Sequence, residues 1–322
     1  MTHLDCARLC AALLALACGG QLAAQSEPPA EPPTERQIVV TGEREPPTER
    51  EVTDQARNIS IIGSPLDNPL PRFEGVLCPG VLGLKGDAAA YIVERLRYNA
   101  EQFDLRLAED DGNCEPNLIV AFVEDAQDAL VTLARSQGYM LAGLSIDRRG
   151  ELLDAPGAAR VWVNTVTRTN TGMPVPSARD ASSAPEKTIS YDESGPIRVT
   201  MPPVASGWAS HSRIYFPTRE DIVSVLVLFD RDQVRGKSLL QLADYATMRG
   251  FAFTRETRGE VPATTILSLF DGEGPKPERL TEFDLGYLGS LYEGIPNIPA
   301  ASKLASVSNH IERQAEAAEA RQ

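Results

Sequence analysis

The stretch GKSLLQLADYATMRG, which begins at Gly236, contains the residues whose types and spacing come closest to a known chemistry. Gly236, Lys237 and Ser238 match the end of a phosphate-binding loop, G-x-x-x-x-G-K-[ST]. Such a loop needs two glycines, because its backbone N–H groups must wrap around the phosphates. Arg231 holds the position of the first glycine, where a side chain would block that wrap. A nucleotide site is therefore not expected, and Ser238 with Gln241 instead predicts the capping box of a helix.

Zinc-dependent peptide hydrolysis is the second chemistry to compare with this helix. It requires H-E-x-x-H-x-x-G, in which two histidines one turn apart bind the metal and the glutamate acts as a base. Aligned on Gly250, the four motif positions are held by Ala243, Asp244, Thr247 and Gly250. Asp244 and Thr247 should share one face of the helix, directed toward the groove where a protease holds its metal. Without a histidine they are a poor ligand pair for catalytic zinc.

Other catalytic groups are equally hard to assemble. His211 and His310 are the histidines outside the N-terminal leader, and neither has a His or Cys partner at ligand spacing. His211 lies between two serines, but on a strand these would point to the opposite face, and no G-x-S-x-G motif occurs. We therefore expect no metal, no cofactor and no identifiable catalytic residue. Carboxylates are numerous, so an acid-pair hydrolase stays open as an alternative.

The segments around the 238–249 helix resemble those of metzincins more closely than its ligand positions do. LTEFDLGYLGSLY, which begins at Leu280, is similar to the LT-x-x-D-x-x-x-L-x-x-LY helix that ends many metzincins, and CEPNLIVAF, which begins at Cys114, resembles a preceding sheet strand. From about 85 to 295, the chain resembles a bacterial family of exported domains of unknown function that look like metzincins stripped of zinc ligands. The resemblance implies a single zincin-like domain with a degenerate active helix. The alternative is that this helix only faces a core.

The N-terminus has the layout of a secretory signal peptide. Arg8 precedes an apolar run, and small residues end at Ala24, so residues 1–24 should be removed by cleavage after Ala24. Lipidation of Cys18 and a buried N-terminal helix are the alternatives. No other run approaches the ~18 apolar residues of a membrane span. We expect a periplasmic or secreted protein of a Gram-negative envelope.

Export bears on the cysteines, because Cys6, Cys10 and Cys18 would leave with the leader. Cys78 and Cys114 would then remain in an oxidising compartment, which favours one disulfide that closes a loop of roughly 35 residues. Two free buried thiols are the alternative.

Composition limits the partners. The 31 basic and 45 acidic residues give a net charge of −14, which disfavours nucleic acid and anionic membrane surfaces. With 322 residues, 42% of them hydrophobic, the chain can bury a large core. The expected partner is an unknown envelope protein or ligand, and we treat the chain as a monomer.

Residues 25–69 are predicted to be a disordered Pro/Glu-rich tail, because this composition cannot bury enough apolar surface to offset its ordering entropy. The sequence EPPTER occurs twice there, and trimming of 25–57 is expected to leave the fold intact. One apolar island, IVVTG, begins at Ile38 and ends at Gly42. It resembles a stretch near the start of TonB-dependent receptors, and a docking strand is one interpretation.

Residues 70–300 are predicted to form an α+β domain with a mixed sheet, packed helices and a long irregular insertion at 170–207. A terminal helix is expected at 301–322. Helical spacing and composition place the other elements as follows: helices at 87–104 (capped by Asp87), 125–138, 145–154, 238–249 and 280–292 (behind the capping pattern Thr281-x-x-Asp284), and strands at 117–125, 159–169, 210–216 and the second half of 221–230.

These patterns favour a non-catalytic exported domain that binds a partner or ligand in the cell envelope. One alternative is a metal-independent hydrolase that uses carboxylates near Asp244. Another is a TonB-linked accessory protein that acts through the island from Ile38 to Gly42.

Overall fold

The computed structural model describes residues 46–320, except for 63–65, 67, 110–111, 137–148, 151, 154–156, 176–186, 191–195, 200–213, 258, 260 and 273–274. Of residues 187–190 and 196–199 only the backbone is described. The chain divides into two units, 1–45 and 46–322, and the description below concerns the second. The predicted leader, the island from Ile38 to Gly42 and His211 lie outside the described residues. Within the described residues, no helix has the length and apolar character needed to cross a membrane.

A mixed sheet organises the protein, as predicted, and most of its strands are parallel. Its strands are β1 (Arg72–Phe73), β2 (Pro79–Leu82), β3 (Leu118–Val123), β4 (Ala159–Thr169) and β7 (Thr218–Asp230). β2, β3 and β7 lie side by side in parallel, and β4 pairs antiparallel with the other edge of β7. β1 also pairs in parallel with β7, along the same edge of β7 as β3. The fold is therefore mixed α/β.

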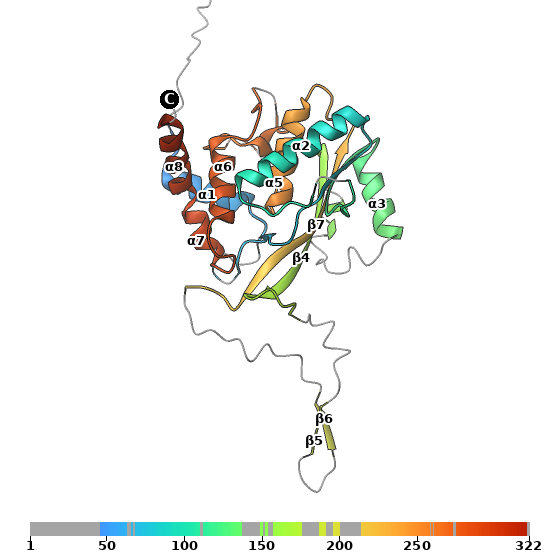
Figure 1. Cartoon of the computed structure of the whole chain (residues 1–322), viewed down its shortest axis with the longest axis vertical. Coiled ribbons are helices and arrows are strands. Elements are labelled where there is room, and N and C mark those ends of the chain that lie inside the picture. The colour runs from blue at the N-terminus through green and yellow to red at the C-terminus, as the bar shows by residue number, and fades with distance from the viewer. Residues whose placement is uncertain are drawn as a thin grey trace, which may run out of the picture. The chain divides into compact units, whose positions relative to one another are not determined.

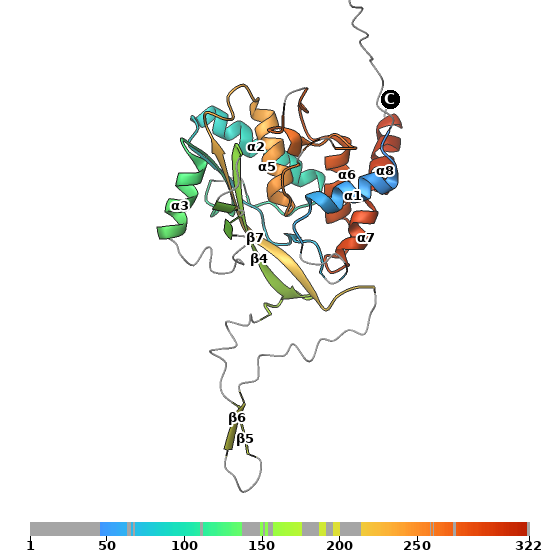
Figure 2. The same cartoon turned by 180° about the vertical axis from the view of Figure 1, so that it is seen from behind.

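Helices cover both faces of this sheet (Figures 1 and 2). They are α1 (Glu49–Ile59), α2 (Gly86–Gln102), α3 (Ala126–Ser136), α5 (Leu239–Phe251), α6 (Glu282–Tyr292), α7 (Ala300–Ala305) and α8 (Val307–Glu319). α3 lies on one side, where Leu130 packs with Ala121 and Leu228. The other helices lie on the opposite side, which holds the main core, and α2 and α5 are nearest to the sheet.

A β-bulge at Val223 divides the long strand β7 into two halves. β4 pairs Asn164 with Ser224 and Thr165 with Ile222, so that Val223 has no partner in the ladder. The extra residue shifts the alternation of side chains, because a strand exposes successive residues on opposite faces. As a result Ile222 lies on the same core-facing side as Val225, Val227 and Phe229. Before the bulge, each residue of β7 therefore lies on the opposite face of the sheet from the one that strict alternation would give it.

The predicted boundary of the folded domain at residue 70 is wrong. Within the expected 25–69 tail, residues 49–59 form α1, whose Val52, Ala56 and Ile59 are buried in the main core. Thr48 and Glu51 form a complete capping box at its start. Thr48 lies in the second EPPTER repeat and Glu51 directly follows that repeat, so the Pro- and Glu-rich composition conceals the signal. α1 therefore belongs to the fold, and trimming through residue 57 would remove most of a packed helix.

We expect Ile59→Ala to lower the free energy of unfolding by roughly 2–5 kcal/mol, because the side chain is only 2% exposed and its truncation leaves a cavity. Urea unfolding followed by circular dichroism measures this change. Arg50→Ala on the same helix is the matched control, because that side chain is 92% exposed, and it should shift stability by less than about 0.5 kcal/mol. Equal effects of the two substitutions would mean that α1 is not packed.

Other element predictions differ from the structure in detail. Residues 214–216 are not in a strand, and β7 begins only at Thr218, because the backbone of Phe216 bonds instead to Asn297 across the chain. The 301–322 helix is two helices that meet at Ser306. The N-cap of α2 is Lys85 rather than Asp87.

Two further predictions fall partly outside the described residues. The predicted 145–154 helix lies mostly outside the described residues, although 149–150 and 152–153 are helical. The 170–207 segment, predicted to be irregular, contains an antiparallel pair, β5 (Lys187–Ser190) and β6 (Pro196–Val199).

The capping boxes predicted for α5 and α6 are both confirmed, by Ser238 with Gln241 and by Thr281 with Asp284. The Asp284 carboxylate is completely buried. It accepts hydrogen bonds from the Thr265 hydroxyl, the Ile266 N–H, and both the N–H and the hydroxyl of Thr281. Burial outweighs these donors and raises its pKa from 3.8 to about 6.

The raised pKa of Asp284 predicts a specific pH dependence. Because the folded state holds this proton more tightly than the unfolded state, its contribution to stability is present below pH 3.8 and is lost as the pH rises to about 6. The loss amounts to about 3 kcal/mol. The difference in unfolding free energy between the protein and its Asp284→Asn variant should change by most of that amount in this direction between pH 4 and 7. A flat difference would contradict the assignment.

Candidate functional site

Asp244, at the centre of α5, is 0% exposed and lies in a hydrogen-bond network with α2. Arg95 donates to both of its carboxylate oxygens, from Nε at 2.7 Å and from Nη2 at 2.9 Å. The Asn99 amide donates to Oδ1 at 2.8 Å, and the backbone N–H of Leu280 donates to Oδ2 at 2.8 Å. Four donors from two other segments therefore surround this carboxylate.

Thr247 shares the face of Asp244, as predicted, because the amide of Asn99 donates to both side chains. Its hydroxyl donates to the backbone carbonyl of Ala243 at 2.9 Å. Ala243 and Thr247 are both 0% exposed. Gly250 lies against the sheet so closely that a Cβ there would come within 2.8 Å of the Leu118 side chain. All four positions aligned with the zincin motif are therefore packed in the interior.

The prediction that this face points into an open groove is wrong. Arg95 and Asn99, one helical turn apart on α2, occupy the space that a groove would need. The carboxylate has no access to solvent and its oxygens are already bonded, so as placed it has no route to a substrate. Among the described residues, no group of three or more His, Cys, Asp or Glu could hold a metal ion. His310 bonds to Glu293 and to the backbone of Ser306.

A more promising site lies where β7 changes partner along one edge. β1 pairs with Asp221 and Ile222, and β3 begins to pair only at Val225. Val223, the bulge residue, therefore has no ladder partner on either side. A cavity of about 280 Å³ lies at this gap, and its apolar lining comes from Phe73, Ile222 and Val223. Bulges beside cavities commonly re-aim side chains at functional sites.

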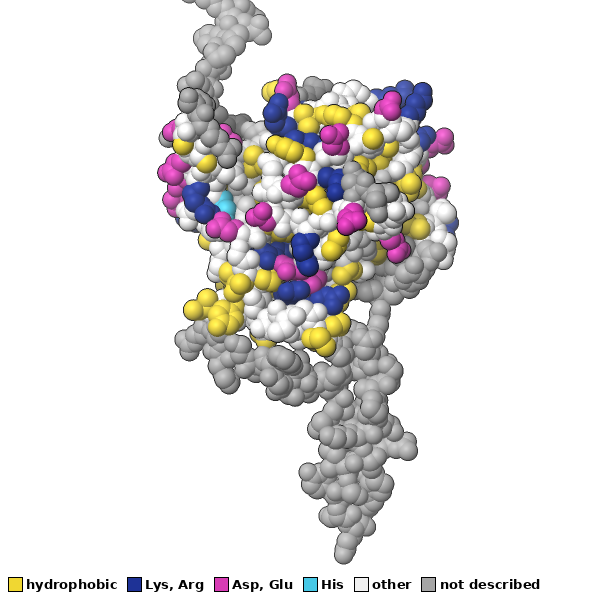
Figure 3. Space-filling model, viewed as in Figure 1, with side chains coloured by type: hydrophobic (Ala, Val, Ile, Leu, Met, Phe, Trp, Pro, Cys, Tyr) yellow, Lys and Arg dark blue, Asp and Glu magenta, His cyan; other side chains and the backbone are white. Residues whose placement is uncertain are grey.

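Charged side chains form the polar wall of this cavity. Arg168 of β4 and Arg219 of β7 lie directly opposite each other in the ladder, an arrangement of like charges that is unfavourable by itself. Asp221 compensates for it: its Oδ2 lies 3.3 Å from Nε of Arg168 and accepts a 3.0 Å bond from Nη2 of Arg219. Glu74, directly after β1, lies 3.5 Å from Arg219. Basic and acidic side chains gather over this part of the protein in Figure 3.

The hydrogen-bonding capacity of this wall is not completely used. Nε of Arg219 and Oδ1 of Asp221 form an ion pair at 2.8 Å, but neither atom makes a hydrogen bond within the described residues, and both are buried. The Asp221 side chain is only 7% exposed, and burial raises the pKa of its carboxyl above the ordinary value, against the lowering effect of Arg219. Buried polar atoms are normally bonded, so such a pair indicates a place for a polar ligand or water.

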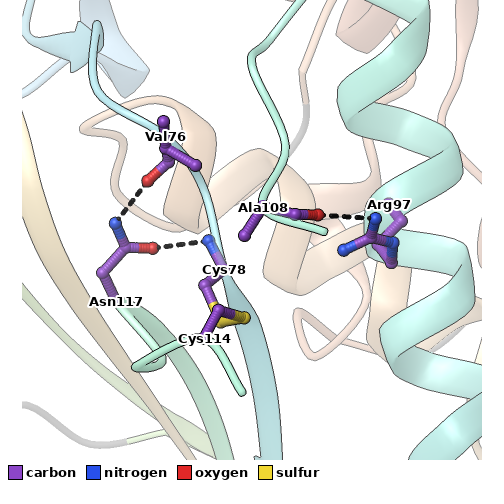
Figure 4. Close-up of a disulfide and its surroundings, with 6 residues drawn as sticks. All are labelled: Val76, Cys78, Arg97, Ala108, Cys114 and Asn117. Atoms are coloured by element: carbon purple, nitrogen blue, oxygen red, sulfur yellow. Dashed lines mark hydrogen bonds between the residues drawn. A yellow bond between two sulfur atoms is a disulfide. The ribbon is translucent and has the colours of Figure 1, made fainter. Parts of the chain in front are cut away.

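The Cys78–Cys114 disulfide holds the rim of the cavity. The predicted proximity of these cysteines is confirmed, because their Cα atoms are 6.2 Å apart and their sulfurs are bonded. Asn117, which lines the cavity, donates to the backbone carbonyl of Val76 and accepts from the N–H of Cys78 (Figure 4). The bridge therefore ties the chain between β1 and β2 to the chain that enters β3.

A second hollow, of about 660 Å³, lies at the carboxyl end of β3, where open α/β sheets commonly bind ligands. It is wide and lined by Glu124, Asp125 and Asp128 together with Arg231. Asp125 accepts from the N–H of Asp128 at the start of α3, and Arg231 donates to the carbonyl of Gly83. Asp125 and Arg231 thus have local structural partners. In the cavity between β1 and β3, called the gap cavity below, Nε of Arg219 and Oδ1 of Asp221 make no hydrogen bond.

Comparison with family models, with curated proteins and with solved structures finds no match to this chain. The assignment of a site therefore depends on its geometry. Sequence reasoning did not select Glu74, Arg168, Arg219 or Asp221. The spacing of Arg219 and Asp221, two apart in a strand, was a visible signal that they share a face. Nothing in the sequence indicated that Arg168 and Glu74 would join them.

Proposed function

We propose that the chain is an exported, non-catalytic domain that binds a small polar ligand in the cavity between β1 and β3. The observation that carries this proposal is the buried pair of Arg219 Nε and Asp221 Oδ1, which lack hydrogen-bond partners beside a cavity of about 280 Å³. Pre-formed concave sites with an apolar lining and a few convergent polar groups are typical of ligand binding.

The non-catalytic part of the proposal is supported by the state of Asp244. Its four hydrogen bonds and complete burial give it a structural role between α5, α2 and the chain before α6. A general acid or base must reach the proton that it transfers, and this carboxylate is enclosed. The hydrolase alternative near Asp244 therefore has no geometric support.

Export is supported by the leader-like N-terminus and by the disulfide, since such bonds persist in oxidising compartments. The mass of the mature protein from a periplasmic fraction tests it. Cleavage after Ala24 would leave Gln25 as the first residue, and retention of the leader in a cytoplasmic protein would contradict export.

A distant relationship to metzincins is a further part of the proposal. It is supported by the order of elements, in which an antiparallel edge strand, β4, precedes the inner strand β7, a turn at Gly236 and the helix α5. α5 packs against the sheet, as this relationship requires, with Gly250 in contact with Leu118 and Val225.

The binding function can be tested with a substitution that fills the cavity and keeps its charges. Gly75 lines the cavity, and a Cβ built there meets no atom within 4 Å, so that Gly75→Leu should fold normally and occupy the ligand space. Gly86→Leu is the matched control, because its Cβ also meets nothing and it begins α2 outside the cavity.

The low-molecular-weight fraction of a Gram-negative periplasmic extract should raise the melting temperature of the protein and of Gly86→Leu, but not that of Gly75→Leu. A ligand at 100 times its Kd stabilises by about 2.7 kcal/mol, which is readily measured. The bound molecule, identified by native mass spectrometry, should be recovered unchanged. Equal protection of Gly75→Leu would place the site elsewhere, no protection of any form would contradict binding, and chemical conversion of the ligand would contradict the non-catalytic assignment.

A further inference from the structure

We infer that the cavity between β1 and β3 takes a small zwitterion, a free α-amino acid with a short apolar side chain. This inference rests on the proposed binding function and names the class of its ligand. Three properties of the cavity carry it: the balance of charge in its wall, the position of its unfilled hydrogen bonds, and its size with an apolar lining.

The charge balance excludes ligands with a net charge. Arg168 and Arg219 contribute two positive charges to the wall, and Glu74 and Asp221 contribute two negative charges. A net anion or cation would leave an uncompensated charge in a partly buried site, which costs free energy. A ligand with one ammonium and one carboxylate group keeps the sum at zero.

Arg72, a fifth charge nearby, is not available to the ligand. Its guanidinium donates to the backbone carbonyls of Leu291, Tyr292 and Gly294 at the end of α6, and to Glu74 at 2.6 Å. Its positive charge thus lies against the negative end of a helix dipole. Glu74 is already bonded to this arginine, and Oδ2 of Asp221 to Arg219, so that Oδ1 of Asp221 is the acceptor that we assign to a ligand ammonium.

The unfilled hydrogen bonds present a donor and an acceptor side by side. Nε of Arg219 has an N–H to donate, and Oδ1 of Asp221, 2.8 Å away, has lone pairs to accept. An α-amino acid carries its carboxylate and ammonium on one carbon, so both groups can reach such adjacent partners at once. The ligand carboxylate should accept from Arg219 and Arg168, and the ammonium should donate to Asp221.

Size and lining restrict the rest of the ligand. At about 280 Å³ the cavity is at or below the lower limit of common drug-sized pockets. Of the apolar lining residues, Phe73 and Ile222 are only 4% and 2% exposed, so Val223 provides the principal apolar surface next to the charged wall. A short aliphatic side chain on the amino acid can cover this surface without the need for a further polar partner.

Calorimetric titration of the purified protein with a defined panel tests the class. The panel is alanine, valine, acetate, isobutyrate, methylamine and isobutylamine, in which the acids and amines each carry only one of the two charged groups. Alanine or valine should bind at least tenfold more tightly than any singly charged compound.

Two kinds of variant accompany the panel. Gly75→Leu should abolish binding of the amino acids, and Gly86→Leu should bind as the unmodified protein does. Asp221→Asn, which keeps the shape and removes the charge, should weaken amino-acid binding at least tenfold and weaken acetate binding less. Melting curves establish that each variant folds, so Gly75→Leu carries the test if Asp221→Asn does not fold.

The outcomes separate the class of ligand from the existence of the site. Amino-acid binding that Gly75→Leu abolishes supports the inference. Acetate or an amine that binds as tightly as alanine overturns the zwitterion class and leaves the cavity as a binding site. If no panel compound binds but the periplasmic extract still protects in a way that Gly75→Leu abolishes, the class is wrong and the binding function stands. If no panel compound binds and the extract does not raise the melting temperature, both the ligand class and the binding function are contradicted.

Discussion

Asp244→Ala should destabilise the protein by about 3–5 kcal/mol, one of the largest effects expected from a single substitution in this fold. The change leaves the guanidinium of Arg95 without its bidentate partner and removes the acceptor of the Asn99 amide and of the Leu280 N–H. Breaking an ion pair with a buried carboxylate is costly because the remaining arginine, whose side chain is only 21% exposed, keeps a largely desolvated charge without its partner. Urea unfolding monitored by circular dichroism measures the loss.

Asp232→Ala is the matched control for this prediction. Asp232 also pairs with an arginine, Arg235 at 2.8 Å, but both side chains are almost fully exposed. Exposed pairs contribute little, so the control should change stability by less than about 1 kcal/mol. If Asp244→Ala were as mild as the control while ligand binding was lost, Asp244 would have to be reassigned from the framework to the binding site.

The Cys78→Ser/Cys114→Ser variant should be less stable by about 3–4 kcal/mol, the chain-entropy value for a loop of this length. The two cysteines are 36 residues apart in the sequence, and the bridge restricts the unfolded chain over that interval. Ligand affinity should fall as well, because Asn117 at the cavity rim bonds to the segment that the bridge fixes.

A reducing agent provides the control for this second prediction. It should destabilise the unmodified protein to the level of the double variant and leave the double variant unchanged. A variant with undiminished stability would show that the fold does not depend on the bridge. Undiminished ligand affinity with lowered stability would show that the cavity rim is held by the hydrogen bonds of Asn117 alone.

Several elements could be predicted from the sequence because their signals are local. The strand at 159–169 has the predicted bounds, and the helices after Ser238 and Thr281 begin at the predicted capping boxes. A capping box satisfies its own backbone N–H groups within four residues, so no distant contact is needed to define it. The strands near 117–125 and at 159–169 were recognisable from their apolar composition and alternation, but the mixed sheet that they join was an expectation of the zincin-like resemblance.

The position of α1 and the role of Asp244 could not be predicted, because both depend on distant residues. α1 is mostly polar, and its few apolar residues are stabilised by packing into a core from the rest of the chain. Asp244 resembled a degenerate catalytic position until its partners were known, and Arg95 lies 149 residues away in the sequence. Helical spacing predicts a shared face but not what covers it.

The gap cavity is hidden from the sequence for a further reason. It exists because β1 ends before β3 begins along the same edge of β7, and because Val223 is bulged out of the ladder with β4. Register and bulges are set by pairing across the sheet, which no single strand encodes. The alternation of Arg219 and Asp221 gave their common face, but Arg168 and Glu74 come from two other segments.

An NMR titration of the ¹⁵N-labelled protein with alanine, and with the ligand recovered from the periplasmic extract, tests the central claim most directly. Binding in the gap cavity predicts that the largest amide shifts occur at Gly75, Asn117 and Val223, which line it. The amides of Asp244 and Thr247, buried between α5 and α2, should stay nearly unchanged. If the extract ligand instead shifts Asp244 and Thr247 and leaves the cavity amides in place, the active-helix position is the binding site and this account is wrong.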